Sequence, residues 1–215
     1  MHKINKKTFG IFTAVVLVLF ALSCVTMSEA KTKKSAKTKQ TKKVSSSAPA
    51  RKLSVLNFSK GELPSSVSET VSAVLTEENI EAGDELGLKI NFNGRGWCGC
   101  GKIDRSWSGF GSFKFNAFNP QDKDLTFTLV IKDKESITNK VGRDTWIVLP
   151  FVLKPGMNNV SLDLNKAKPY GEKRDLDLSE IKTWHFSYKF FPEQKWEETG
   201  PDEVTIFVSD MRVEG

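Results

Sequence analysis

The chain has 215 residues, of which 39% are hydrophobic and 10% are aromatic, so it suffices for one packed domain with extensions. Its net charge is +6, but residues 1–30 carry +2 and residues 31–52 carry +9, so residues 53–215 carry −5. The part that can fold is therefore acidic, which excludes a polyanion-binding role resting on its bulk charge.

Residues 1–30 are typical of an export signal. Three lysines precede Phe9–Ser23, an uncharged run of 15 residues, which is shorter than the roughly 20 apolar residues of a spanning helix. Two cleavage sites stay open: Ser28–Ala30 suits ordinary signal peptidase, whereas Cys24 lies in a segment that resembles a bacterial lipoprotein box and would then be lipidated. An uncleaved anchor is the third alternative. All three place residues 31–215 outside the cytoplasm, lipid-anchored in a bacterial cell envelope or secreted.

Residues 31–52 predict a disordered basic linker, because lysine, threonine, serine and alanine dominate and no apolar period is present. A flexible chain of this length reaches on the order of 25 Å. The linker is either a solvated spacer or a polycation, Lys31–Lys43, that adheres to anionic envelope polymer or to a membrane surface. Such adhesion weakens as salt rises. No aromatic residue interrupts the tail, so base stacking is not indicated and no nucleic acid partner is expected.

Residues 53–215 predict one all-β domain. Short runs rich in Val, Ile, Phe, Thr and Trp alternate with Gly, Pro, Asn and Asp, and no long helical period occurs. This pattern favours a β-sandwich or barrel of about 8–10 antiparallel strands, with one short helical turn at Asp175–Ile181. The runs are LSVLNF, ELGLKINF, GSFKFNAF, LTFTLVIKD, TWIVLPFVL, NNVSLDL, TWHFSYKF and EVTIFVSDMRV.

Alternation predicts which strand faces are buried. In residues 125–131 the odd-numbered positions are all Leu, Phe or Ile, and in residues 184–190 the even-numbered positions are all aromatic. Successive side chains of a strand point to opposite faces, so these sets belong to the core. Trp107 and Trp184 fall on core-facing positions and are expected to be buried. The face that carries His185, Ser187 and Lys189 is polar and is either plain surface or a binding surface.

The segment Gly94–Trp107 contains Cys98 and Cys100 among four closely spaced glycines, which predict a flexible connection. The two thiols lie on the same side of an extended chain, near the separation limit for a disulfide, and a turn at Gly99 would bring them closer. Outside the cytoplasm such a pair tends to oxidise. We expect a strained local disulfide, with two free thiols as the alternative. A structural zinc site is disfavoured because it usually takes four ligands.

The order of motifs across residues 53–215 resembles the jelly-roll carbohydrate-binding modules of the galactose-binding-like kind. The matching segments are WSGFGSFKFNAFNP, LTFTLVIKD, LKPGMNNVSLDL, RDLDLSEIKTWHF and VTIFVSDMRVEG. The resemblance implies a jelly-roll β-sandwich and non-catalytic sugar binding. It also implies a structural calcium at Asp210. The first-strand acid of the family's calcium pair falls here at Ser59, a poor ligand, although Glu62 is close by in sequence and calcium prefers several hard oxygens.

No enzyme motif is found. The sequence has no Gly-X-Ser-X-Gly elbow and no phosphate-binding loop, and His185 is the only histidine outside the signal region. Acidic residues Glu193, Glu197, Glu198 and Asp202 lie in one charged segment that favours solvent exposure rather than a glycosidase pair. We therefore expect the protein not to be an enzyme.

Carbohydrate binding is the function that the residues favour. Sugars stack their C–H faces on aromatic rings, with polar groups around the rim. Trp196 and Trp97 are expected in loops, and Trp146 on a polar face. The predicted site residues are Trp196, Trp146, Trp97, Arg143, His185, Asn116 and Lys189. Two alternatives remain: a structural or adhesive envelope protein with no sugar site, and a secreted glycoside hydrolase.

Overall fold

The computed structural model describes residues 50–138, 142–171, 174–190 and 202–215, and the side chains of residues 142 and 143 are outside that description. The predicted export signal, Cys24, nearly all of the basic linker and Trp196 lie outside the described residues. In the described part of the chain, no helix is long and apolar enough to cross a membrane.

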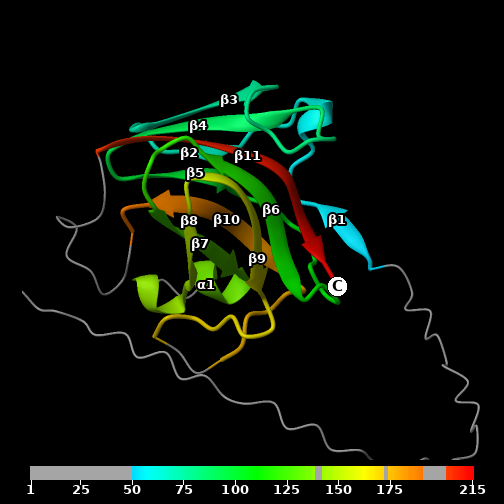
Figure 1. Ribbon diagram of the computed structural model, residues 1–215. Coiled ribbons are helices and arrows are strands. Elements are labelled where there is room, and N and C mark those ends of the chain that lie inside the picture. Colours follow the sequence, from blue (N-terminus) through cyan, green and yellow to red (C-terminus); the bar gives the residue numbers. More distant parts are fainter. Residues whose placement is uncertain (1–49, 139–141, 172–173, 191–201) are drawn as a thin grey trace, which may run out of the picture. The chain divides into compact units, whose positions relative to one another are not determined.

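Two antiparallel sheets pack face to face, as Figure 1 shows. Sheet A has the order β3-β4-β11-β6-β9, with β1 beside the end of β11, and sheet B has the order β2-β5-β10-β7-β8. The strands of sheet A are β1 (Lys52–Ser54), β3 (Val71–Thr76), β4 (Gly87–Asn93), β6 (Ser112–Asn119), β9 (Gly156–Asp163) and β11 (Glu203–Glu214). Those of sheet B are β2 (Ser66–Val67), β5 (Gly96–Cys100), β7 (Leu125–Asp133), β8 (Ile147–Leu153) and β10 (Ile181–Tyr188). The predicted all-β sandwich is confirmed.

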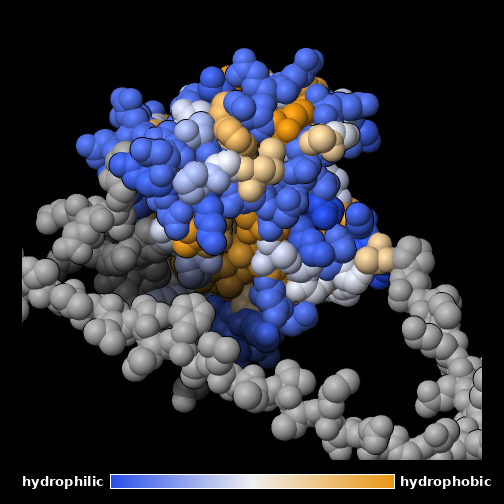
Figure 2. Space-filling view, viewed as in Figure 1, coloured by the Kyte–Doolittle hydropathy of each residue, from blue (hydrophilic) through white to orange (hydrophobic). Residues whose placement is uncertain are grey.

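The core lies between the sheets and is built by the predicted alternation. Trp107 and Trp184 are buried, and both belong to the central cluster. Aromatic rings meet across the layers: the Phe115 and Phe186 ring centroids, from opposite sheets, lie 4.9 Å apart. Such pairs add to the free energy gained by burying apolar area. On the face shown in Figure 2 most residues are hydrophilic, with hydrophobic residues exposed only in patches.

In the described residues, helical structure is limited to short pieces. The α-helix α1 (Lys134–Thr138) directly follows β7, and two 3₁₀ turns are formed by η1 (Phe58–Lys60) and η2 (Gly142–Thr145). The segment predicted as a short helical turn, Asp175–Ile181, forms a single hydrogen-bonded turn rather than a longer helix: the Glu180 N–H donates to the Asp177 carbonyl at 3.3 Å, and β10 begins at Ile181.

Gly94–Trp107 is not the flexible connection that its glycines predicted. Residues Gly96–Cys100 form β5, which pairs with β2 on one side and with β10 on the other. The strand was missed because glycine is disfavoured in strands unless another backbone approaches closely. That approach occurs here, since Gly99 lies directly opposite His185.

Candidate functional site

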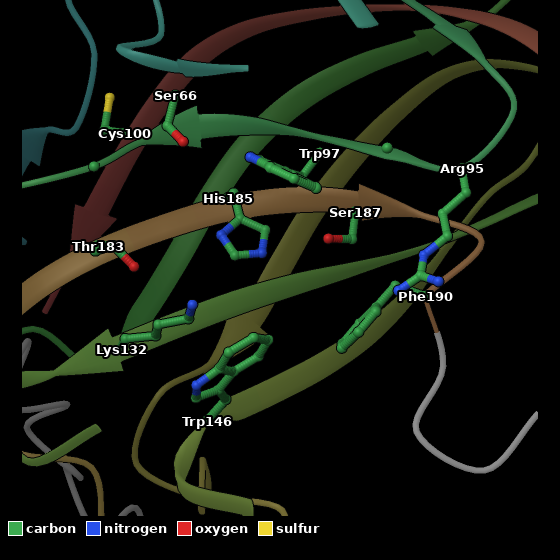
Figure 3. A pocket seen from close by; sticks show the side chains of 12 residues that line it. Ser66, Arg95, Trp97, Cys100, Lys132, Trp146, Thr183, His185, Ser187 and Phe190 are labelled. Atoms are coloured by element: carbon green, nitrogen blue, oxygen red, sulfur yellow. The ribbon is translucent and has the colours of Figure 1, made fainter. Parts of the chain in front are cut away.

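A hollow of about 480 Å³ lies on the outer face of sheet B, and we call it the β10 groove (Figure 3). It is centred on β10, whose alternate residues Thr183, His185 and Ser187 point outward while Trp184 and Phe186 enter the core. The period of two along a strand thus places a polar row on the groove floor. β5 lies on one side of this row, and β7 and β8 lie on the other.

Aromatic side chains rise on both sides of the polar row. On the β5 side, Trp97 is 46% exposed, and its ring centroid lies 6.4 Å from that of His185. On the other side, Trp146 lies just before β8, and its ring centroid is 6.1 Å from that of Phe190, with an interplanar angle of 30°. The groove therefore combines two aromatic flanks with a polar floor, a composition found in ligand sites.

Gly99 is the residue that makes room for the histidine. A Cβ at position 99 would lie 2.2 Å from the Trp184 carbonyl oxygen and 2.6 Å from the His185 Cβ. No side chain fits at that separation, so the strand beside His185 must carry glycine. The cluster of glycines that predicted flexibility instead allows close packing of β5 against β10.

Trp97 is positioned by the segment before β3. Its backbone N–H donates to the Ser68 Oγ at 3.1 Å, and its carbonyl accepts from the Ser68 N–H at 3.0 Å. These two bonds anchor the backbone of β5 at the point where the indole projects outward. The exposed ring thus stands on a fixed strand rather than on the loop that the sequence predicted.

Lys132 brings a positive charge to the floor. Its Nζ lies 3.5 Å from the centroid of the Trp146 ring, which is the geometry of a cation–π contact. Burial lowers the pKa of Lys132. Arg95, in the turn between β4 and β5, holds its guanidinium carbon 6.0 Å from the Phe190 ring centroid.

His185 is a neutral side chain at physiological pH. Burial, and then the nearby Lys132 ammonium, lower the pKa of His185 to about 3. Both causes disfavour the protonated imidazolium. The imidazole therefore offers one donor and one acceptor to a ligand and is not a base that titrates near pH 7.

The groove brings together three of the predicted sugar-binding residues, namely Trp97, Trp146 and His185. The other four are not placed there. Trp196 and the side chain of Arg143 lie outside the described residues. Asn116 belongs to β6 of sheet A and lines a separate shallow hollow with Lys114 and Arg212 instead of the β10 groove.

Lys189 does not line the β10 groove either. It has a positive φ of 54°, so the alternation of β10 ends at Tyr188. The Lys189 ammonium instead pairs with Asp202 at 2.7 Å, and Phe190 takes a place in the groove lining. The Thr128 hydroxyl donates to the Phe190 carbonyl at 3.0 Å and fixes this exit from the strand.

The two cysteines are free and buried, so the predicted disulfide is absent. Both thiols lie on the core side of β5, as their spacing predicted. Gly99 between them pairs regularly with Ser66 and His185, and the turn that would have shortened the distance does not form. Burial, followed by the neighbouring Cys100, raises the pKa of Cys98 to about 12, which leaves that thiol protonated and unreactive.

The predicted calcium ligand does not sit in a multi-oxygen cage. Asp210 has a positive φ of 46° at an irregularity of β11, and its carboxylate pairs with Arg212. Glu62 accepts a hydrogen bond from the Asn57 backbone N–H at 2.8 Å. Within the described ranges, no three His, Cys, Asp or Glu side chains are grouped to hold a metal. These residues do not fit a calcium site.

Comparison with known proteins identifies relatives only in structure. No protein-family model and no curated protein matches the sequence. Among solved structures, a family 11 carbohydrate-binding module from Clostridium thermocellum, in complex with a β-1,3-1,4-mixed-linked tetrasaccharide, matches with a TM-score of 0.50 and 17% identity. The match covers 78% of this chain and 96% of the module.

Two agarases match as well. One has a TM-score of 0.54 and 18% identity over 76% of this chain, and an exo-β-agarase has a TM-score of 0.54 and 14% identity over 74%. This chain spans only 24% and 25% of their respective lengths. These matches confirm the jelly-roll β-sandwich of carbohydrate-binding modules that the sequence motifs predicted.

Proposed function

We propose that residues 53–215 form a non-catalytic carbohydrate-binding domain that holds a saccharide in the β10 groove. The observation that carries this proposal is the row of Thr183, His185 and Ser187 flanked by Trp97 on one side and by Trp146 on the other. Aromatic rings suit the C–H faces of sugars, and the polar row suits their hydroxyls. The structural match to a module that binds a tetrasaccharide supports the same function.

A binding role without catalysis is supported by the chemistry of the groove. An effective general base has a pKa near the working pH, whereas the pKa of His185 is about 3. No Asp or Glu is among the described residues that line the groove, so that lining lacks the carboxylate pair of a glycosidase. Incubation with the saccharides that bind should release no new reducing ends.

Glycan-array binding and polysaccharide-gel retardation of the full chain test the proposal. The panel includes mixed-linked β-glucan and agarose. One structural neighbour is in complex with a β-1,3-1,4-mixed-linked tetrasaccharide, and two others are agarases. Trp97→Ala and Trp146→Ala should each weaken binding by at least about tenfold, which is about 1.4 kcal/mol. Met157→Ala, which removes an exposed side chain from β9 on the other sheet, should have no effect. Absence of binding to every glycan would instead favour the structural or adhesive alternative.

We also propose that the domain is exported to the bacterial cell envelope or beyond it, on the basis of residues 1–52. The mass of the mature N-terminus distinguishes lipidated Cys24 from a chain that starts at Lys31. Replacement of the seven lysines in Lys31–Lys43 by glutamine tests the linker. If the linker adheres to anionic polymer, the variant should lose a salt-sensitive part of its cell-wall binding, and an unchanged pull-down would identify a plain spacer.

A further inference from the structure

The charged side chains that line the β10 groove are positive, whereas the net charge of the surrounding domain is negative. Residues 53–215 carry a net charge of −5. The described residues of the groove lining nevertheless include two cations, Arg95 and Lys132, and no carboxylate. A groove for neutral sugars needs both donors and acceptors for hydroxyl groups. This lining is rich in donors and positive in charge.

Lys132 has no counter-ion within the described parts of the chain. No carboxylate there lies within ion-pair distance of its ammonium, and it donates no hydrogen bond to a described residue. Its one recorded partner group is the Trp146 ring. A half-buried ammonium without a described carboxylate partner is costly, since buried charges are normally paired.

Thr183 supplies a second unsatisfied group at the same place. Its hydroxyl oxygen is buried and has no hydrogen-bond partner among the described residues. Thr183 lies directly opposite Lys132 where β10 pairs with β7. Figure 3 shows the Thr183 hydroxyl, the Lys132 ammonium and the His185 ring around one part of the hollow. An ammonium and a hydroxyl side by side can donate to two oxygens of one anionic group.

We infer that the β10 groove selects a saccharide that carries an anionic substituent, a carboxylate or a sulfate, with Lys132 as its counter-ion and Thr183 as a second donor. This inference rests on the proposed function and names its substrate class. The sugar ring stacks on an aromatic flank, while the anionic group pairs with the Lys132 ammonium, which no described carboxylate does. Neutral His185 leaves that place to Lys132 and contributes hydrogen bonds only.

The test compares matched polymers that differ only in charge. One pair is a polyuronate and its neutral methyl ester, and the other is a sulfated galactan and its desulfated form. The charged member of at least one pair should bind at least about tenfold more tightly, and this preference should shrink as salt rises. The pair that shows the preference identifies carboxylate or sulfate as the ligand group.

Variants separate the groove from other cations of the chain. Lys132→Met keeps the apolar stem over Trp146 and should remove the preference for the charged polymer, whereas Lys132→Arg should keep it. Lys89→Met is the matched control, because Lys89 also lies over an aromatic ring, with its Nζ 5.7 Å from the Phe207 centroid, but on sheet A. All measurements are repeated with the lysines of Lys31–Lys43 replaced by glutamine, so that the linker cannot mimic the effect.

The outcomes distinguish the two proposals. Equal binding of charged and neutral polymers, or equal losses in Lys132→Met and Lys89→Met, overturns the anionic ligand and leaves the carbohydrate-binding function standing. Binding of none of these polymers, nor of any glycan on the array, overturns both. Should Lys132→Met fail to fold by circular dichroism, Thr183→Val provides the second variant, and it should weaken the binding of the charged polymer more than the binding of the neutral polymer.

Discussion

The outer faces of the two sheets use similar polar residues in different ways. On sheet A, Lys114 and Arg212 both pair with Glu214, each at 3.1 Å, beside a shallow hollow of about 250 Å³. On sheet B, Lys132 lies over Trp146 in a hollow about twice as large and pairs with no carboxylate in the described residues. Charges that are paired with each other are typical of a solvated surface. A cation without a described carboxylate partner, beside aromatic rings, is typical of a ligand site.

The same contrast exists between neighbours in β7. Asp133 is fully buried and accepts hydrogen bonds from the Ser136 hydroxyl at 2.7 Å, the Asp177 N–H at 3.0 Å and the Arg174 guanidinium. The Thr145 hydroxyl in turn donates to the Ser136 carbonyl at 3.3 Å, just before Trp146. The paired Asp133 carboxylate thus stabilises the backbone beside Trp146. The preceding residue of the strand, Lys132, points into the groove.

Asp133→Ala tests the paired side of the contrast and should have the largest effect. The substitution removes the buried carboxylate that accepts hydrogen bonds from Arg174, Ser136 and Asp177, and it should lower the free energy of unfolding by about 3–5 kcal/mol. Urea denaturation measures the loss. Asp163→Ala, which breaks the exposed pair with Lys166 and the hydrogen bond from the Asn165 N–H, should cost much less stability. An equal decrease in the free energy of unfolding in the two variants would show that the hydrogen bonds to Asp133 do not stabilise the fold.

The network also predicts a pH dependence. Burial alone raises the pKa of Asp133, but the hydrogen bonds from Arg174, Asp177 and Ser136 outweigh it and lower that pKa below its ordinary 3.8. A lowered carboxyl pKa stabilises the fold above the unfolded-state value and loses that stability as pH falls through the folded value. The wild-type protein should therefore lose stability below about pH 4, and Asp133→Asn should lose less over the same window.

Gly99→Ala tests whether the groove depends on close packing of β5 against β10. The added Cβ would meet the Trp184 carbonyl oxygen at 2.2 Å, so the strands must separate, at a cost of about 1–3 kcal/mol. Gly101→Ala is the control, because its nearest neighbour would lie at 3.6 Å. Thermal unfolding compares the two. A Gly99→Ala protein as stable as the Gly101→Ala protein would mean that β5 is free to shift.

Lys132→Met tests, in the absence of ligand, how much the half-buried Lys132 cation lowers the stability of the fold. The substitution removes a half-buried cation and keeps its apolar contacts, so the free energy of unfolding should stay the same or rise by up to about 1 kcal/mol. Because burial lowers the pKa of Lys132, wild-type stability should rise as pH approaches the ordinary lysine value of 10.5. Lys132→Met should lack that rise, whereas Lys89→Met should retain it.

The sandwich could be predicted because its strands alternate apolar and polar residues. The groove could be predicted only in part, because it depends on contacts between residues that are far apart in the sequence. The alternation in β7 and β10 placed Trp184 and His185 on the correct faces, because burial of one face imposes a period of two. Phe190 was misplaced because a positive φ at Lys189 ends that period. Lys132 was missed because its contact with Trp146, and the absence of a carboxylate partner among the described residues, depend on neighbours in space. Gly99 was placed in a flexible connection with a possible turn, because its pairing with His185 cannot be seen in the local sequence.

The cysteines of β5 provide the last and smallest test, because the disulfide prediction and the structure differ on them. Two free core thiols, with the pKa of Cys98 raised to about 12, should react slowly with a thiol reagent in the native protein. Unfolding in denaturant without reductant should then expose both to rapid reaction. A protein that yields no thiol from this pair in denaturant, but yields two after reduction, would carry the disulfide after all. β5 would then be bent at Gly99, and the packing against His185 that opens the groove would have to change with it.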